Sequence, residues 1–233
     1  MEEITLGQLL QAVNGTLLGP FQNPSAIMQK VDTDSRNMHP GSLFIPLVGD
    51  RFDGHAYINA ALESGAVGCL TARERESYRE DKFYVKVANT QRALRDLAKY
   101  YKKKFPIPVV ALTGSVGKTT TKDMVAAVLG EKYRVLKTEG NLNNEIGVPM
   151  TLLRLSGEHE IAVLELGMNH AGEIDYLSAL VEPDVVLMTN IGDSHIEHFG
   201  SREKILEAKS EIFHHVKSGA FVVINGDDPL LNT

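Results

Sequence analysis

The sequence predicts an α/β protein in two parts, a small N-terminal α/β domain followed by a mostly parallel sheet flanked by helices. Two observations support this prediction. Short apolar segments alternate with helical ones in the second half, which is typical of a parallel sheet covered on both faces. One apolar segment also runs directly into the glycine turn, lysine and helix of "ALTGSVGKTTTKD" (residues 111–123), a layout that holds phosphate groups.

The first hundred residues mix short helix and strand signals. The expected elements, in chain order, are a helix at 6–13 capped by Thr5, a strand at 42–47, a helix at 57–64, strands at 67–71 and 83–87, and a helix at 90–103. The prolines of "FPIP" (105–108) cannot continue the last helix. We therefore place a domain boundary there and predict domains at 1–105 and 106–233.

The second domain has a more regular pattern. Strands are expected at 109–112, 161–166, 185–189 and 221–224, with helical segments that include 124–129 and 202–216. In such sheets, ligands bind beyond the carboxyl ends of the strands. The sequence stops at Thr233, soon after a strand, so we expect this domain to be incomplete.

Composition excludes several classes of protein. The 233 residues are 43% hydrophobic with a net charge of −6, which argues against a nucleic-acid partner held by bulk electrostatics. The single cysteine, Cys69, lies in an apolar run and cannot form an internal disulfide. No basic leader or long apolar segment is present. We therefore expect a cytoplasmic protein that does not insert into membranes.

The glycine turn departs from the usual Walker A spacing, because Leu112 occupies the position of the first glycine. A shorter form is present, with Gly114, two residues, and then Gly117, Lys118 and Thr119. Its glycines let backbone N–H groups converge on oxygen, the lysine supplies a charge, and the threonine offers a hydroxyl to Mg²⁺. A plain turn with a solvated lysine is the alternative, but the flanking strand and helix favour nucleotide binding and a sheet of the P-loop ATPase type.

Two further residues are expected beyond strand ends. Glu165 ends the apolar run "IAVLELG", where a carboxylate needs a compensating cation or hydrogen bonds. A metal role is favoured over an edge-strand glutamate that faces water, because Mg²⁺ prefers oxygen ligands. His195 follows the next strand, but a structural role is favoured for it, because imidazole suits Mg²⁺ poorly.

A lysine interrupts an apolar helical stripe. Within the expected helix 202–216, Ile205, Lys209, Ile212 and Val216 follow helical spacing. A buried ammonium tends to lose its proton, and a neutral amine can react with CO₂ to give an anionic carbamate. Taken alone, a lysine that extends to water is the better interpretation.

The segment "TEGNLNNEIGVP" (138–149) holds three asparagines and two glycines. Asparagine amides can hydrogen-bond phosphate or base, but this composition is equally that of an ordinary loop. Both interpretations stay open from the residues alone.

Together these segments resemble the Mur ligase family over essentially the whole chain. The matching motifs are "TDSRNMHPGSLFIPLVGDRFDGHAYINAALESGA", "ALTGSVGKTTTKD", "TEGNLNNEIGVPMTLL", "LELGMNHAGEI", "TNIGDSHIEHFGS" and "EAKSEIF". The short phosphate loop fits this family's version. "LELGMNHAGEI" is most similar to the subgroup that adds D-alanyl-D-alanine to UDP-N-acetylmuramoyl-tripeptide.

The resemblance implies roles for individual residues. Those assigned to ATP are Gly114, Ser115, Val116, Gly117, Lys118, Thr119, Thr120, Asn141 and Asn144. Those assigned to Mg²⁺ are Thr119, Glu165, His195 and Lys209, with the lysine carbamylated. Lys118, Glu165, His195 and Lys209 together form the implied catalytic set. The resemblance thus reverses the weak expectations for the histidine and the buried lysine.

In the N-terminal domain the resemblance implies a site for the UDP-linked precursor. The residues assigned to it are Ser35, Arg36, Asp50, Arg51, Phe52 and His55. From the residues alone, Arg36 and Arg51 are plausible partners of a diphosphate.

The implied reaction is amide-bond formation driven by ATP. The γ-phosphoryl group passes to the precursor's carboxylate, and the amine of D-alanyl-D-alanine then displaces phosphate. The implied protein is a monomer, and because the family's C-terminal domain is absent we expect this chain alone not to turn over. The alternatives are a Mur ligase that adds the third residue, a small-molecule kinase, and a nucleotide-binding switch module.

Overall fold

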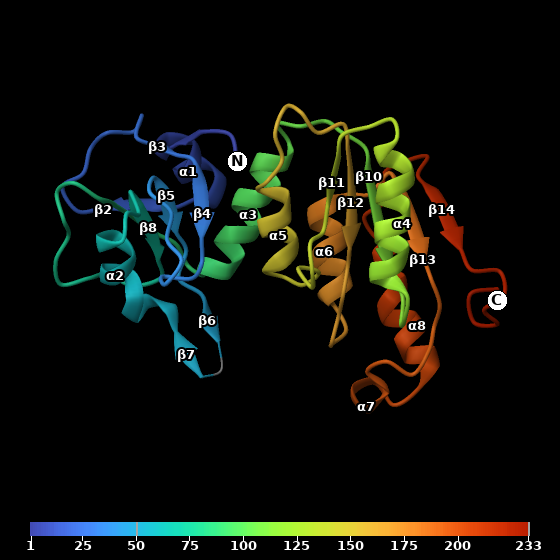
Figure 1. Cartoon of the computed structure of the whole chain (residues 1–233). Coiled ribbons are helices and arrows are strands. Elements are labelled where there is room, and N and C mark those ends of the chain that lie inside the picture. Colours follow the sequence, from blue (N-terminus) through green and yellow to red (C-terminus); the bar gives the residue numbers. More distant parts are fainter. Residues whose placement is uncertain (50, 233) are drawn as a thin grey trace. The chain divides into compact units, whose positions relative to one another are not determined.

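A computed structural model describes residues 1–49 and 51–232 (Figure 1). The chain divides into two compact units, Met1–Tyr101 and Lys102–Thr233. The predicted domains, 1–105 and 106–233, divide at a slightly later residue, and the function assigned to each stays a prediction. None of the described helices is long and apolar enough to cross a membrane.

The first unit mixes short strands with helices. Its elements are β1 (Ile4–Thr5), α1 (Leu6–Val13), β2 (Thr16–Leu18), β3 (Ile27–Met28), β4 (Lys30–Asp32), β5 (Ser42–Phe44), β6 (Val48–Gly49), β7 (Phe52–Asp53), the 3₁₀ helix η1 (Gly54–Tyr57), α2 (Ile58–Glu63), β8 (Gly68–Thr71), β9 (Phe83–Lys86) and α3 (Thr90–Lys102), whose last residue belongs to the second unit.

Five of these strands form one sheet in the order β2-β9-β8-β5-β4. All neighbours are parallel except β2, which runs antiparallel to β9. The apolar face of α2 packs on this sheet, where Ile58 and Leu62 meet Phe44, Cys69 and Tyr84. This packing buries Cys69 completely, as its apolar neighbours in the sequence indicated.

The second unit alternates strands with helices. Its elements are β10 (Val109–Thr113), α4 (Lys118–Gly130), β11 (Val135–Lys137), α5 (Gly147–Leu152), β12 (Ile161–Glu165), α6 (Glu173–Val181), β13 (Val185–Met188), α7 (Ile196–Phe199), α8 (Arg202–Ser210), the 3₁₀ helix η2 (Glu211–Phe213) and β14 (Phe221–Ile224).

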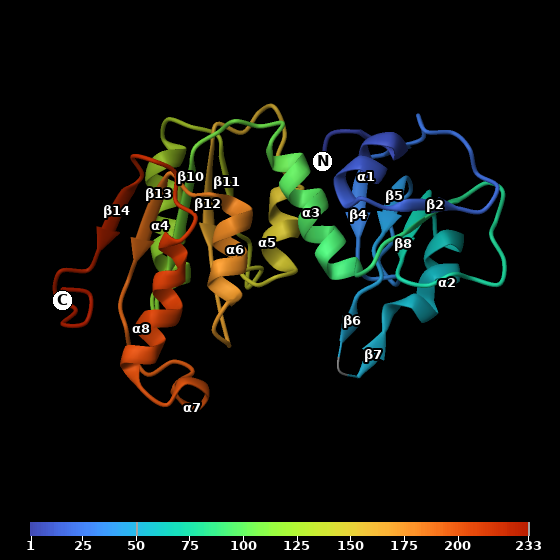
Figure 2. The same ribbon diagram turned by 180° about the vertical axis from the view of Figure 1, so that it is seen from behind.

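The predicted parallel sheet is confirmed. Its five strands are all parallel in the order β11-β12-β10-β13-β14. Helix α4 covers one face, and α6 and α8 cover the other (Figures 1 and 2). The core under α4 joins Ala126 to Val110, Leu112 and Val163 of the central strands. The carboxyl ends of β10, β12 and β13 therefore lie side by side.

In three places this unit differs from what the sequence indicated. The strand β11 was missed, because its three residues are too few to show an apolar run. The helix expected at 202–216 ends at Ser210 and tightens into η2. The last strand was expected to be covered on both faces, but Phe221–Ile224 is 41–74% exposed at the sheet edge.

Candidate functional site

The glycine turn leaves the central strand β10 and opens α4. Gly114 has a φ of +150°, and a Cβ placed there would lie 1.9 Å from Thr189 Oγ1. Gly117 has a φ of +80° and is the N-cap of α4, so the helix begins at Lys118. Gly114 is required because of its positive φ and because a Cβ does not fit there, whereas Gly117 is required because of its positive φ alone.

Hydrogen bonds join this loop to the segment that follows β13. The Ser115 and Val116 N–H groups donate to Asn190, at 2.9 Å to its backbone oxygen and 3.0 Å to its Oδ1 respectively. The Thr189 hydroxyl donates to the Val116 carbonyl at 2.8 Å, and the Ser194 hydroxyl to the Ser115 carbonyl at 3.1 Å. Residues that follow β13 thus hold in place the backbone of the glycine turn, which follows the neighbouring strand β10.

The loop lysine bends back over the turn. Its Nζ donates to the Gly114 carbonyl at 2.8 Å and to the Ser115 carbonyl at 3.2 Å. Burial lowers the pKa of Lys118, and the negative charge of Glu165 partly opposes that shift. Thr119 and Thr120 follow at the exposed start of α4.

Glu165 ends β12 and is only 2% exposed, so the alternative of a glutamate that faces water is wrong. Thr119 Oγ1 donates to its Oε2 at 3.0 Å, and Asn143 Nδ2 donates to its Oε1 at 2.8 Å. Within the described part of the chain, these donors compensate the carboxylate without an ion pair. Asn143 was not among the predicted site residues, although it belongs to the asparagine-rich loop.

A cavity of about 240 Å³ lies beside this group. It brings together residues from the start of α4, the asparagine-rich loop, the segment between β12 and α6, the loop after β13, and α8. Its lining consists of Lys118, Asn141, Asn143, Asn144, Gly167, Met168, Asn169, Glu173, His195 and Lys209. Five predicted site residues therefore share one cavity, although they are up to 91 positions apart in sequence.

Lys209 is 1% exposed, so the lysine does not extend to water as its spacing alone had suggested. Among the described residues it makes no ion pair with a carboxylate. Burial, with a smaller effect of the Lys118 charge, lowers its pKa to about 8. Burial and the Lys209 charge likewise lower the pKa of His195. The lysines Lys118 and Lys209, which face this cavity, favour an anionic ligand.

His195 has a φ of 66° and precedes α7. This left-handed conformation is uncommon for residues other than glycine, although histidine adopts it more often than most. Its N–H and carbonyl lie in a tight turn, where the Phe199 and His198 N–H groups both donate to the His195 carbonyl. His195 also lines the cavity, and uncommon backbone conformations of this kind are concentrated at functional sites.

The predicted metal residues offer a hydroxyl, a carboxylate, an imidazole and an amine. Within the described part of the chain, no group of three or more His, Cys, Asp or Glu side chains is arranged to hold a metal ion. A hard cation would therefore take oxygen ligands from Thr119 and Glu165 and from phosphate, and a carbamate on Lys209 would supply another. The donor set thus fits Mg²⁺ bound together with a nucleotide, with the imidazole as the poorest match.

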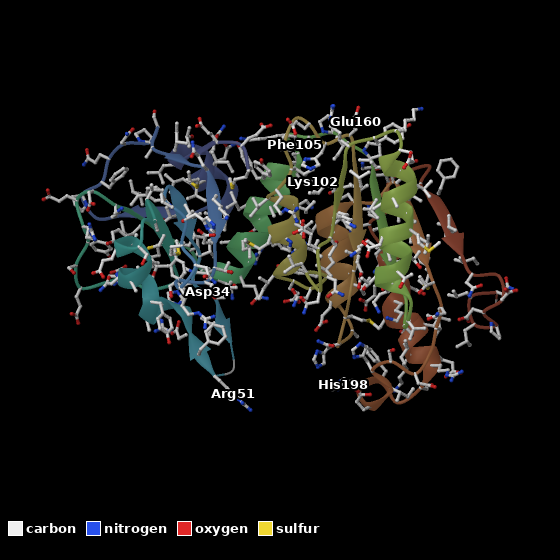
Figure 3. All side chains as sticks on the ribbon, viewed as in Figure 1. Asp34, Arg51, Lys102, Phe105, Glu160 and His198 are labelled. Atoms are coloured by element: carbon white, nitrogen blue, oxygen red, sulfur yellow. The ribbon has the colours of Figure 1, made fainter. Side chains whose placement is uncertain are left out.

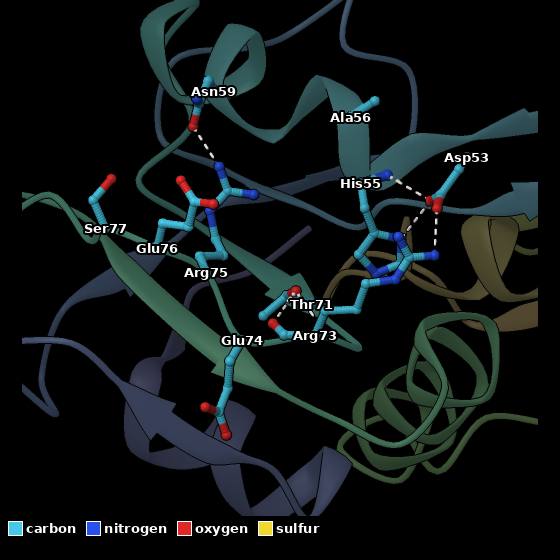
Figure 4. Close-up of a pocket in the computed structure, with 10 residues that line it drawn as sticks. All are labelled: Asp53, His55, Ala56, Asn59, Thr71, Arg73, Glu74, Arg75, Glu76 and Ser77. Atoms are coloured by element: carbon cyan, nitrogen blue, oxygen red, sulfur yellow. Dashed lines mark hydrogen bonds and ion pairs between the residues drawn. The ribbon is translucent and has the colours of Figure 1, made fainter.

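The first unit has a separate polar cavity of about 420 Å³ (Figure 4). It lies beyond the carboxyl end of β8 and is lined by Asp53, His55, Ala56, Asn59, Thr71, Arg73, Glu74, Arg75, Glu76 and Ser77. Of the described residues predicted to hold the UDP-linked precursor, it contains His55 alone. The imidazole is buried between the Asp53 carboxylate, 2.7 Å from its Nδ1, and the Ala72 N–H, which donates to its Nε2 at 3.0 Å.

The other predicted precursor residues lie outside that cavity. Arg36 is exposed and pairs with Asp34 at 2.7 Å, and Ser35 is half-buried between them. Arg51 projects from the β6–β7 hairpin (Figure 3), and Phe52 is 57% exposed. Asp50 lies outside the described residues. The precursor site therefore stays a prediction.

Comparisons with known proteins establish the family. The chain matches the Mur ligase middle domain over residues 112–233 and the Mur ligase family catalytic domain over residues 28–102. This chain belongs to the Mur ligase family, as its motifs predicted. The phosphate loop lies on the parallel sheet of the matched middle domain, beside the cavity that Lys118 and Lys209 line.

Individual relatives are more specific. The chain is 46% identical to the UDP-N-acetylmuramoyl-tripeptide–D-alanyl-D-alanine ligase of Bacillus subtilis, over 97% of the chain and 50% of that protein. A crystal structure of MurF from Acinetobacter baumannii has a TM-score of 0.92 at 40% identity, covering 98% of this chain and 50% of the other.

A third relative was solved with a nucleotide. The MurF ligase of Thermotoga maritima in complex with ADP has a TM-score of 0.81 at 37% identity, covering 88% of this chain and 47% of that protein. The chain thus spans about half the length of the relatives it matches.

Proposed function

We propose that this chain is the precursor-binding and ATP-binding portion of a ligase that joins D-alanyl-D-alanine to UDP-N-acetylmuramoyl-tripeptide. The proposal is supported by the 46% identity to the ligase of that name and by the cavity beside the phosphate loop. In this proposal the first unit holds the UDP-linked precursor and the second unit holds ATP. The reaction takes place in the cytoplasm on a monomeric chain.

The second unit supplies what phosphoryl transfer to a carboxylate needs. The γ-phosphoryl group passes to the precursor's terminal carboxylate, which leaves ADP and an acyl phosphate. The amine of D-alanyl-D-alanine then attacks the acyl carbon and phosphate departs. Catalysis of the first step rests on positioned positive charge over the phosphate oxygens, and Lys118, which faces the cavity, supplies such a charge.

Each loop group has a defined task in this proposal. The N–H groups of residues 114–120 contact the ATP phosphates, and Lys118 exchanges its two loop carbonyls for the β- and γ-phosphate oxygens. Thr119 and Glu165, which are already hydrogen-bonded to each other, take part in holding Mg²⁺. Mg²⁺ held by these residues would neutralise charge on the phosphates. Asn141 and Asn144 lie where they can contact the nucleotide.

Lys209 is the proposed site of carbamylation. Its pKa of about 8 leaves a useful fraction of neutral amine near neutral pH, and a neutral amine attacks CO₂. The carbamate would place an anionic oxygen donor among Lys118, His195 and Glu165. It would also remove the cost of a buried ammonium that, among the described residues, has no carboxylate partner.

The single observation that carries the proposal is the convergence of Lys118, His195 and Lys209 on one cavity. We test it by titration calorimetry of the 233-residue chain with ADP and with GDP in Mg²⁺ buffer. We expect ADP to bind and Lys118→Ala to abolish binding, because it removes the charge that faces the phosphates. Unchanged binding by the variant would contradict the nucleotide site, and equal binding of GDP would contradict its assignment to ATP.

Ligation itself is tested in a chimera. Residues 1–232 replace the matching half of the Bacillus subtilis ligase, and product formation from UDP-precursor, ATP and D-alanyl-D-alanine is followed. We expect product from the chimera and none from its Lys118→Ala version. A chimera that folds and binds ADP but forms product only with a single amino acid in place of the dipeptide would reject the proposed acceptor.

A further inference from the structure

Glu211 caps a helix to which it does not belong. Helix α6 begins after Gly172, whose side chain cannot cap it. Instead Glu211 Oε1 accepts the Gly172 N–H at 2.7 Å, and its Oε2 accepts the N–H of Asp175, the third helical residue, at 3.1 Å. One carboxylate from η2 thus satisfies both donors that a capping box would satisfy, and its charge complements the positive end of α6.

Two further contacts fasten η2 to α6. The buried hydroxyl of Ser178 donates to the Ile212 carbonyl at 2.8 Å, and His214 Nδ1 lies 2.8 Å from Asp175 Oδ1. Because η2 continues directly from α8, these contacts also hold the last turn of α8 against α6. Figure 2 shows the two helices on the same face of the sheet.

The two elements that Glu211 joins carry two walls of the cavity. Lys209 lies on the last turn of α8, two residues before the capping carboxylate. Asn169 and Glu173, at the start of α6, line the same cavity, and the Asn169 N–H donates to Glu173 Oε2 at 2.7 Å. A change in the capping contact would therefore alter the spacing between the lysine and the opposite wall.

We propose that Glu211 is a positioning residue, which fixes Lys209 and the start of α6 in the arrangement that receives the nucleotide. The proposal rests on the proposed function of this cavity. Glu211 acts through Lys209 and not by touching the ligand, since it does not line the cavity. No other described side chain bonds to both the Gly172 and the Asp175 N–H groups, so no neighbour replaces it.

The test compares Glu211→Ala and Glu211→Gln with Glu207→Gln. Glu207 lies two residues on the other side of Lys209 and is exposed, so it is a matched control for a carboxylate on this segment. The first readout is the rate at which Lys209 of the ligand-free chain reacts with an acylating reagent, measured by mass spectrometry. Lys122, which is 2% exposed on α4 and lies outside the cavity, is the internal reference.

We expect Glu211→Ala to speed the labelling of Lys209 about tenfold relative to Lys122, because the freed turn exposes the amine. Glu211→Gln keeps one acceptor oxygen and is expected to give a smaller increase, and Glu207→Gln none. Labelling of both lysines that rises equally would show loss of global stability alone. That result, or no rise at Lys209, overturns the proposal.

The second readout is ADP affinity, which separates this inference from the proposed function. We expect Glu211→Ala to weaken ADP binding about tenfold, as small displacements in binding sites do, with Glu207→Gln unchanged. If the parent chain fails to bind ADP, the proposed function fails while the labelling result still decides the role of Glu211. Unchanged affinity in a Glu211→Ala chain that binds ADP contradicts positioning.

Discussion

Positive charges on the surface of the first unit and in the cavity of the second unit are arranged in opposite ways. In the first unit, exposed arginines pair with nearby carboxylates, as Arg36 does with Asp34 at 2.7 Å and Arg79 with Asp81 at 3.0 Å. In the second unit, Lys118 and Lys209 face a cavity. Neither forms an ion pair with a carboxylate among the residues that the structure describes.

The difference shows how a paired carboxylate and burial each change the pKa of a cationic side chain and its tendency to bind an anion. The hydrogen bond to Arg36 lowers the pKa of Asp34 to about 2, and the same bond raises the pKa of Arg36. Burial instead lowers the pKa of both cavity lysines. A paired surface cation is already satisfied, whereas a buried one without a carboxylate favours an incoming anion. Substitutions at the two kinds of site should differ accordingly.

The largest effect is expected at Gly114. An alanine there would bring its Cβ to 1.9 Å from Thr189 Oγ1, at a φ of +150° that side chains rarely adopt. We expect Gly114→Ala to lower the free energy of unfolding by about 3 kcal/mol or more, from strain and overpacking together. ADP binding should be lost. Urea unfolding and calorimetry measure both.

Gly117→Ala is the matched control for this prediction. Gly117 also has a positive φ, but nothing lies within 4 Å of the added Cβ. We therefore expect a cost of about 1–2 kcal/mol from conformation alone. Equal costs at the two positions would show that the close approach to Thr189 is relieved by movement of the loop.

A smaller effect of opposite sign is expected at Lys209. Lys209→Met removes a buried ammonium and keeps the length of the side chain, so we expect the chain to gain about 1–3 kcal/mol at pH 7 in CO₂-free buffer. ADP affinity should fall in the same variant. A more stable protein that binds its ligand less well would mark the lysine as functional.

The gain should depend on pH in a defined direction. The folded pKa of about 8 lies below the ordinary 10.5, so the folded state binds fewer protons between these values. Stability of the parent chain should rise with pH across that window, relative to Lys209→Met. A difference that stays constant from pH 7 to pH 10 would argue against a buried, uncompensated amine.

Cys69 tests whether burial shifts the pKa of a side chain in the first unit as it does in the second. This thiol lies in the first unit, yet burial raises its pKa to about 12. We expect no reaction of the folded chain with an alkylating reagent at pH 8, and rapid reaction in denaturant. Cys69→Ser should cost about 1–2 kcal/mol, because its hydroxyl meets an apolar cluster. If Cys69→Ser leaves the free energy of unfolding unchanged, burial does not act in the same way in the two units.

The sequence alone predicted most of the second unit and the family. Apolar runs marked four of the five strands of its sheet, namely β10, β12, β13 and β14. The phosphate loop was recognisable from local spacing, because its chemistry is contained in seven consecutive residues. Residue spacing failed for Lys209, whose burial depends on packing between α8 and the sheet. The family motif identified it where periodicity did not.

Contacts between distant segments could not be predicted from local patterns. Asn143 was missed because nothing in a loop of three asparagines says which one reaches Glu165, 22 residues away. The capping contact of Glu211 with α6 spans 39 positions. In the first unit the mixed sheet contains strands of two or three residues, and these are too short to leave a periodic signal.

The smallest effect on stability is expected at Arg36. Both partners of the Arg36–Asp34 pair are solvent-exposed, so Arg36→Ala should leave the melting temperature unchanged. The pKa of Asp34 should rise from about 2 toward the ordinary 3.8, and carboxyl NMR titration follows it. Since that pKa is lowered in the folded chain, any stabilisation by the pair is present above about pH 4 and lost toward pH 2.

If Arg36 also contacts the diphosphate of the precursor, the variant will bind UDP-precursor more weakly with no loss of stability. Unchanged precursor binding together with the raised pKa would leave the arginine as a surface partner of Asp34 and nothing more.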